Sequence, residues 1–190
     1  MKTGVICLQG DVSEHIGILA KLNANPFWVR EKKDLLQATA LIIPGGESTT
    51  ISRLMSESGL FETVKKRAEG GMPVFGTCAG LILLAKEGDS QVERTGQRLL
   101  GLMDMAVNRN AFGRQRESFE ETVSIKGIGS FPGVFIRAPS IRKVYGKCSP
   151  LSQLGDKIIA AMQDNLLATA FHPELTGDER VHRYFLEEIC

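Results

Sequence analysis

The 190-residue sequence predicts an α/β protein in which helices flank a mostly parallel, doubly wound sheet. Three observations predict this fold. Short apolar runs occupy residues 3–8, 40–43 and 74–75, as is typical of parallel strands buried on both faces. Helix-like segments separate these runs, and the connections are short. Since no repeat or linker interrupts the chain, we expect residues 1–190 to form one domain.

The first half is predicted to alternate between strands and helices. We expect the strand at 3–8 to end at Gln9, Gly10 and Asp11, and apolar positions recurring through 12–23 predict a helix. A strand at 26–29, a polar connection at 30–37 and a strand at 40–43 follow. A helix capped by Ser48, Thr49 or Thr50 should end at Gly59, and another helix should occupy 60–70.

The second half of the chain predicts antiparallel additions to the sheet rather than more βαβ units. Short strand-like runs separated by Gly, Pro, Ser and Asn occupy residues 99–107, 119–125, 134–137, 143–145, 157–162 and 166–170. A final helix is expected at 178–189. Between the first two runs, the polar loop of residues 108–118 either carries binding residues or is only solvated charge.

Composition is that of an ordinary globular protein, with 43% hydrophobic and 24% charged residues. Lys and Arg number 23 against 22 Asp and Glu, so we expect no nucleic-acid or membrane partner. Apolar runs stay well short of the about 18 residues that a membrane span needs, and we expect a cytoplasmic protein. The four cysteines lack zinc-ligand spacing, which predicts neither a bound metal nor a disulfide framework.

Cys78 is the candidate nucleophile. The GTCAG sequence of residues 76–80 lies between a short apolar run and an apolar, helix-forming stretch, which predicts a sharp turn from strand to helix. Glycines two residues either side of Cys78 would let the backbone close, and the first turn of the helix would favour negative charge on the sulfur. The alternative is that Cys78 is a small buried hydrophobe.

Two turns at strand ends are candidate binding elements. Gly45 and Gly46 could direct backbone N–H groups into a cavity, as an oxyanion site requires, although many βα loops use a Gly-Gly turn. Gln9 and Gly10 should lie at the carboxyl end of the first strand, where α/β sheets bind ligands, or form only a turn. Glu47 beside an oxyanion site would oppose negative charge unless it held a cationic group of the ligand.

His172 and Glu174 are the candidate base and its orienting carboxylate. If the strand continues through His172, both side chains point to the same side, and Pro173 would hold them extended. The carboxylate could then fix the imidazole tautomer. The other two histidines, His15 and His182, fall on segments expected to be amphipathic and partly exposed.

Together these residues predict acyl transfer to cysteine followed by hydrolysis. Cys78, His172 and Glu174 would supply nucleophile, base and orienter, the roles of a catalytic triad. The N–H of Ala79 and one from Gly45 or Gly46 could bind the oxyanion. The residues alone do not identify the acyl group.

Several motifs resemble the glutaminase subunit family of pyridoxal 5′-phosphate synthase complexes, within the class I, triad-type glutamine amidotransferases. The GTCAG turn at Cys78 and a His-x-Glu pair are common to that whole class. More discriminating are FIRAP at 135–139 and NAFGRQ at 110–115, together with LQGD at 8–11, PGGESTT at 44–50 and FHPEL at 171–175. The matches span nearly the whole chain in the expected order.

The resemblance implies hydrolysis of L-glutamine to L-glutamate and ammonia, which would pass to a separate synthase subunit. Cys78 would attack the amide, His172 would carry the proton and Glu174 would orient it. Gln9 and Gly10 would lie near the oxyanion site and the synthase interface. The glutamine pocket would be lined by Gly46, Glu47, Ser48, Arg109, Ile136 and Arg137. Pyridoxal phosphate would be the product of the complex, and we expect no cofactor in this chain.

Three other readings remain, one of which is a scaffold subunit with a vestigial site. The chain could be the glutaminase of another biosynthetic amidotransferase, although the FIRAP block speaks against this. It could also be a non-amidotransferase protein of the stress or redox type that uses a cysteine elbow, although such proteins usually lack the His-x-Glu pair.

Overall fold

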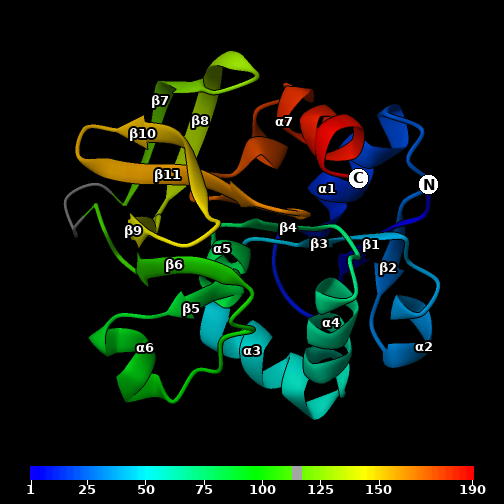
Figure 1. The fold of residues 1–190 in the computed structure, drawn as a ribbon. Helices are drawn as coiled ribbons and strands as arrows, with labels where there is room; N and C mark the ends of the chain where they lie inside the picture. The colour runs from blue at the N-terminus through cyan, green and yellow to red at the C-terminus, as the bar shows by residue number, and fades with distance from the viewer. Residues whose placement is uncertain (113–116) are drawn as a thin grey trace.

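The computed structural model describes residues 1–112 and 117–190. Its centre is a twisted sheet that begins with five parallel strands in the order β2-β1-β3-β4-β12 (Figure 1). These strands are β1 (Thr3–Ile6), β2 (Phe27–Val29), β3 (Ala40–Ile43), β4 (Val74–Thr77) and β12 (Leu166–Thr169). Every residue of β1, β3, β4 and β12 is buried, which explains the apolar runs in the sequence.

The sheet continues from β12 through strands of the second half. The order is β11-β9-β6-β5, β10 pairs with β11, and the pairs β12–β11, β11–β9 and β9–β6 are antiparallel. These strands are β5 (Ala85–Glu87), β6 (Met103–Asn108), β9 (Ser140–Val144), β10 (Ser149–Leu154) and β11 (Lys157–Gln163). The predicted α/β class, a parallel sheet with antiparallel additions, is therefore confirmed.

Helices cover both faces of the sheet (Figure 1). On one face lie α1 (Val12–Lys21) and α7 (Arg180–Tyr184), and α7 continues as a π-helical turn, η2 (Phe185–Ile189). On the other face lie α3 (Ser48–Glu57), α4 (Leu60–Glu69) and α5 (Ala79–Leu84). Two short helices, α2 (Lys32–Leu35) and α6 (Ser90–Thr95), were not predicted. Among the described residues, no helix has the length and apolarity needed to cross a membrane.

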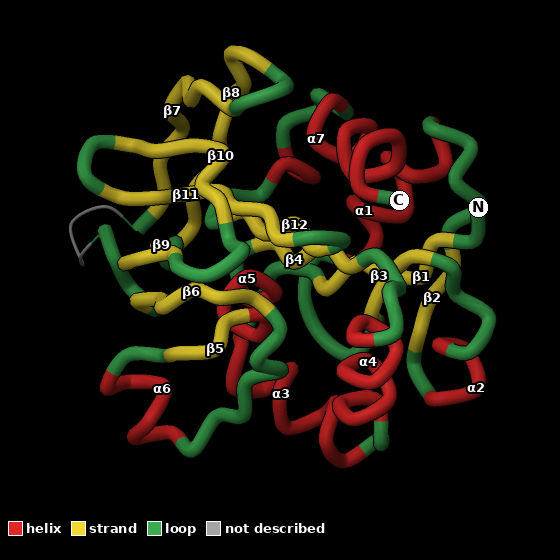
Figure 2. The backbone as a smooth tube through the Cα atoms, in the orientation of Figure 1, coloured by secondary structure: helices red, strands yellow, loops and turns green. Residues whose placement is uncertain are grey.

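A separate hairpin of β7 (Ser118–Ile125) and β8 (Gly129–Ile136) stands beside β10 (Figure 2). Phe119 of β7 stacks on Phe135 of β8 with ring centroids 4.7 Å apart, and Phe135 also packs against Phe171. The backbone N–H of His172 donates to the carbonyl of Val134 at 2.8 Å. The hairpin therefore holds the backbone at His172, the candidate base.

Some element boundaries differ from the prediction. Strands β5 and β10 were not predicted, and residues 99–102 precede β6 rather than belonging to it. The run at 134–137 is the end of a longer strand, because β8 begins at Gly129 and pairs with β7 along its whole length. The expected last helix at 178–189 begins at Arg180 and changes to π-helical geometry after Tyr184.

Candidate active site

Cys78 lies at the turn between β4 and α5. Its backbone has φ 47° and ψ −96°, in the left-handed half of conformational space that few non-glycine residues occupy. A Cβ on Gly76 would overlap the backbone of Gly80, and a Cβ on Gly80 would overlap the carbonyl of Ile43. The glycines flanking Cys78 are therefore required by close backbone packing, and the predicted turn from strand to helix is present.

Two backbone hydrogen bonds hold this turn. The N–H of Cys78 donates to the carbonyl of Thr169 on β12 at 2.8 Å, and its carbonyl accepts from Ile82 in α5 at 3.3 Å. Backbone strain of this kind costs on the order of 1–3 kcal/mol and persists only where the surroundings impose it. Because β12 lies next to β4, the bond to Thr169 also ties the cysteine to the strand that leads to His172.

His172 and Glu174 are in contact, although not through the extended backbone that was predicted. Strand β12 ends at Thr169, and Pro173 begins a 3₁₀ turn, η1 (Pro173–Leu175), which contains Glu174. The turn folds the carboxylate back, so that Oε1 of Glu174 lies 2.8 Å from Nδ1 of His172. The expectation of a strand through His172 is thus wrong, while the expected pairing of the two side chains is present.

Asp11 is a third member of this cluster that sequence reasoning did not single out. Its Oδ2 lies 3.3 Å from Nδ1 of His172, the same nitrogen that contacts Glu174. The ligand atoms of Asp11, His172 and Glu174 lie within 4.8 Å of one another, a spacing at which a metal ion could bind. Both carboxylates already contact the imidazole, an arrangement that could orient the ring for proton transfer. The sequence feature that could have identified Asp11 is its position directly after Gln9 and Gly10, at the end of the first strand.

Electrostatics favour a protonated His172. Burial alone would lower its pKa, but hydrogen bonding to Asp11, Cys78 and Glu174 outweighs burial and raises the pKa well above that of free histidine. The hydrogen bond with His172 in turn lowers the pKa of Asp11, against the opposing effect of burial. The imidazolium is therefore suited to donate a proton and to stabilise negative charge on the neighbouring sulfur.

The Gly-Gly turn packs directly on the imidazole. A Cβ on Gly45 would overlap Cε1 of His172, and a Cβ on Gly10 would overlap the carbonyl of Gly45. Gln9 Oε1 accepts a hydrogen bond of 2.8 Å from the backbone N–H of Glu47. The structure thus brings both predicted strand-end turns to His172. The oxyanion role of Ala79, Gly45 and Gly46 stays a prediction.

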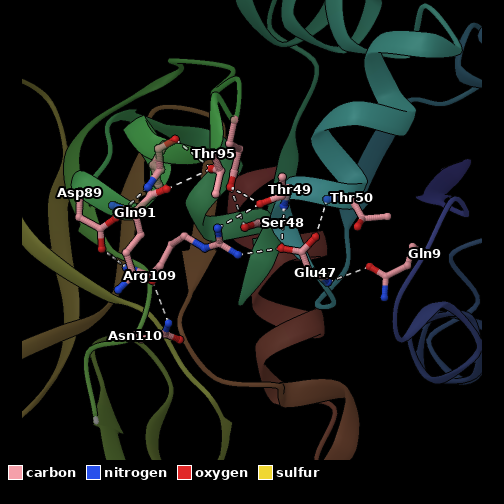
Figure 3. A network of polar contacts seen from close by, with 12 residues as sticks. Gln9, Glu47, Ser48, Thr49, Thr50, Asp89, Gln91, Thr95, Arg109 and Asn110 are labelled. Atoms are coloured by element: carbon pink, nitrogen blue, oxygen red, sulfur yellow. Dashed lines mark hydrogen bonds and ion pairs between the residues drawn. The ribbon is translucent and has the colours of Figure 1, made fainter. Parts of the chain in front are cut away.

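Glu47 joins this turn to the loop that carries Arg109 (Figure 3). Its carboxylate caps α3, accepting from the N–H of Thr49 at 3.1 Å and of Thr50 at 2.6 Å. Nη2 of Arg109 lies 2.7 Å from Glu47 Oε1, and Nη1 donates to Thr49 Oγ1 at 3.0 Å (Figure 3). Two expectations are corrected: Glu47 caps the helix instead of a hydroxyl residue, and the chain itself supplies its cationic partner.

These contacts keep Glu47 ionised. Burial opposes the charged form, yet hydrogen bonds from Thr50 and Thr49 lower the pKa of Glu47 to about 2. The side chain of Asp89 accepts a hydrogen bond of 2.8 Å from the backbone N–H of Arg109 (Figure 3). Asp89 is also the N-cap residue of α6. The carboxylate and the guanidinium are thus held in place before a ligand binds.

The remaining predicted pocket residues differ in exposure. Ile136 is half-buried at the end of β8, whereas Arg137 is exposed, with φ 42° and a 2.6 Å bond from its N–H to the carbonyl of Glu117. Ser48 is buried and donates its hydroxyl to Gln97 at 3.0 Å. Residues 113–115 of the predicted NAFGRQ motif lie outside the described residues.

The two histidines expected on partly exposed faces are both fully buried. His15 of α1 and His182 of α7 meet next to Glu174, with Nδ1 of His15 2.9 Å from Nε2 of His182. The expectation was wrong because it considered each helix alone, whereas α1 and α7 cover the same face of the sheet (Figure 1).

Comparison with known proteins covers nearly the whole chain. The model of the SNO glutamine amidotransferase family matches residues 5–190. Relatives named pyridoxal 5′-phosphate synthase subunit PdxT are 53% identical in Methanosarcina acetivorans, over 100% of this chain and 98% of the relative, and 53% identical in Pelotomaculum thermopropionicum, over 99% and 95%.

Solved structures of glutamine amidotransferases are also similar to this chain. A crystal structure of a glutamine amidotransferase is 50% identical, superposes with a TM-score of 0.92 and covers 97% of each chain. A glutamine amidotransferase from Thermotoga maritima, 12% identical, has a TM-score of 0.66 and covers 98% of this chain and 83% of its own, which shows a common fold alone.

Proposed function

Because the chain belongs to the SNO glutamine amidotransferase family, we propose that Cys78, His172 and Glu174 form the triad with which it hydrolyses glutamine. The chain is the glutaminase subunit of a pyridoxal 5′-phosphate synthase, and it converts L-glutamine to L-glutamate and ammonia for vitamin B6 synthesis. The observation that carries the triad is the 2.8 Å contact of His172 with Glu174 beside a cysteine held at φ 47°.

The reaction proceeds through a thioester. Sγ of Cys78 attacks the side-chain amide carbon of glutamine, and the carbonyl oxygen becomes an oxyanion bound by the N–H of Ala79 and one from Gly45 or Gly46. His172 gives its proton to the departing nitrogen, which leaves as ammonia. The imidazole then takes a proton from water, whose oxygen attacks the thioester, and glutamate and free Cys78 result. A raised His172 pKa suits the acid step.

The glutamine pocket is proposed to lie between the Gly-Gly turn and the Arg109 loop. The Glu47 side chain is 48% exposed, so its carboxylate can still accept hydrogen bonds from the α-ammonium of glutamine while Arg109 contacts it. Arg109 or Arg137 would pair with the α-carboxylate, because a guanidinium matches that group with two parallel hydrogen bonds. Gly46, Ser48 and Ile136 would complete the walls.

Ammonia is proposed to pass to a separate synthase subunit, in keeping with the names of the relatives. Gln9 and Gly10 would lie close to that interface, next to the oxyanion turn. We propose that residues 1–190 act as one glutaminase domain in the cytoplasm, without a bound cofactor, metal or nucleic acid. Another biosynthetic amidotransferase is disfavoured because the full-length relatives at about 50% identity are synthase subunits. The same identity disfavours a redox or stress protein.

The experiment measures glutamate and ammonia formed from glutamine, with and without a synthase subunit. Cys78→Ala should abolish both products and leave synthase binding intact. Cys190→Ala is the matched control, because this cysteine is free and exposed. Wild-type product formation by Cys78→Ala would refute the triad.

A further inference from the structure

A buried histidine pair lies directly behind the candidate triad. His15 projects from α1, and its Nε2 lies 3.5 Å from Oε2 of Glu174 and 3.2 Å from Oγ1 of Thr77, the residue before Cys78. Its other ring nitrogen, Nδ1, lies 2.9 Å from Nε2 of His182 on α7. Both imidazoles are fully buried. The pair therefore joins the last helix of the chain to the orienting carboxylate.

Glu174 needs a partner on the side away from His172. Oε1 contacts His172, whereas Oε2 is buried and makes no hydrogen bond within the described residues. Burial raises the pKa of Glu174, and the hydrogen bond with His172 only partly opposes this. A buried carboxylate oxygen without a partner is costly, so a donor that approaches Oε2 stabilises the ionised form. Nε2 of His15 faces that oxygen.

The unpartnered atom of His182 decides which nitrogens carry protons. Nδ1 of His182 is buried and has no partner among the described residues. A buried N–H without an acceptor is rarer in proteins than an unused acceptor, so we assign the proton of His182 to Nε2. That N–H donates to Nδ1 of His15, whose own proton must then lie on Nε2. The donor therefore points toward Glu174 and Thr77.

Both rings stay neutral at pH 7, as this assignment requires. Burial lowers the pKa of His182 to about 3. Burial also lowers the pKa of His15 well below its usual value, and the positive charge of His172 lowers it further. The ring of Phe75 packs edge-on against both imidazoles, with centroids 6.5 Å from His15 and 5.7 Å from His182. This apolar contact keeps the two rings in one orientation.

We propose that His15 is a positioning residue for the reaction, holding the Glu174 carboxylate against His172, and that His182 fixes the tautomer in which His15 does so. The proposal rests on the proposed glutaminase function. The carboxylate of Asp11 competes with Glu174 for the imidazole, because it lies 3.3 Å from the same His172 nitrogen. Without the donor from His15, Glu174 can turn away and leave the imidazole to Asp11.

The test compares two substitutions of similar length. His15→Gln keeps an N–H donor near the place of Nε2, whereas His15→Met fills the space without one. Glutaminase kcat and KM are measured with a synthase subunit bound. We expect His15→Met to lower kcat by about 10–100-fold with KM unchanged, as for other supporting residues, and His15→Gln to recover most of the loss. The alkaline limb of the pH profile should move to lower pH in His15→Met, because the Glu174 contact raises the pKa of His172.

His182 provides the second arm. His182→Gln keeps a donor toward His15 and should remain near the wild-type kcat, while His182→Met should fall below it. In the His15→Met background, His182→Met should cause no further loss of kcat, because His182 acts through His15. If circular dichroism shows that His15→Met does not fold, the comparison of kcat between His182→Met and His182→Gln tests the proposal instead.

Two outcomes overturn the proposal. One is an equal kcat for the folded Met and Gln variants of His15, or of His182 if His15→Met does not fold. The other is a Met variant of that residue that keeps the wild-type kcat and pH profile. Cys78→Ala, assayed in parallel, separates this failure from failure of the proposed function. If Cys78→Ala is inactive, the glutaminase assignment stands and only the positioning role is lost.

Discussion

Nδ1 of His172 lies 2.8 Å from Oε1 of Glu174, although the two residues differ in backbone conformation. His172 has φ −102° and ψ 86° after the strand, and Glu174 belongs to a 3₁₀ turn that starts at Pro173. The proline restricts His172 to a non-helical conformation, and the turn then returns the carboxylate to the imidazole. Pairing of the two side chains therefore depends on the turn.

Glu174→Gln should lower kcat by about 10²–10⁴-fold with little change in KM. The amide keeps the shape of the side chain but no longer carries the charge that stabilises the His172 imidazolium, and related triads lose activity on this scale. Steady-state glutaminase assays measure the effect. Glu120→Gln, an exposed change on β7, is the control. A variant within threefold of the wild type would remove Glu174 from the triad.

Gly45→Ala should abolish most activity, because the added Cβ would overlap Cε1 of His172. The imidazole or the turn must shift, and a misplacement of about 1 Å can cost 10²-fold in rate. Gly17→Ala is the matched control, since a Cβ there meets nothing within 4 Å and Gly17 lies inside α1. That control should keep full activity and stabilise the fold by roughly 0.5–1 kcal/mol. Equal activities of the two variants would contradict the close packing.

Arg109→Lys should raise KM for glutamine by about tenfold or more and change kcat less. Lysine keeps the charge but cannot contact Glu47 and Thr49 together, nor pair with a carboxylate through two hydrogen bonds. Glutamine titrations of the initial rate provide the measurement. The control is Arg53→Lys on the exposed side of α3. An unchanged KM would exclude Arg109 from the pocket.

His182 should make the free energy of unfolding depend on pH. Its pKa is about 3 when folded and near 6.5 when unfolded, so the unfolded chain binds the proton first as pH falls. The contribution is full above pH 6.5 and is lost toward pH 3. Relative to His182→Gln, the wild type should lose up to about 1.4 kcal/mol per pH unit between pH 6 and 4. Urea unfolding at several pH values measures this difference, and a constant difference would contradict the buried neutral imidazole.

Much of the fold was predictable because buried parallel strands leave a local signal. Residues 40–43 form β3 as predicted, and the Cys78 turn follows from two glycines whose Cβ atoms would collide with backbone. Strand β10 escaped prediction because its sequence, SPLSQL, contains a proline and three polar residues and pairs irregularly with β11. Its conformation depends on the neighbouring strand rather than on its own side chains.

The site was predictable where one short segment carries the chemistry and not where distant elements meet. Cys78 and the His172–Glu174 pair each lie within one local motif. The places of Asp11 and His15 depend on how α1 sits against the sheet, and only Asp11 had a local signal, its position directly after Gln9 and Gly10. Glu47 was misread for the same reason, because its partner Arg109 lies 62 residues away in sequence.

The proposed triad requires Cys78 to form a thioester with the γ-carbonyl of glutamine. Rapid acid quenching of the chain mixed with glutamine and a synthase subunit, followed by mass spectrometry of the Cys78 peptide, tests this claim most directly. We expect a γ-glutamyl adduct on Cys78 that is absent from Cys78→Ala, while Cys190→Ala still carries it. Wild-type turnover with no adduct on Cys78, and continued ammonia release by Cys78→Ala, would rule out Cys78 as the nucleophile.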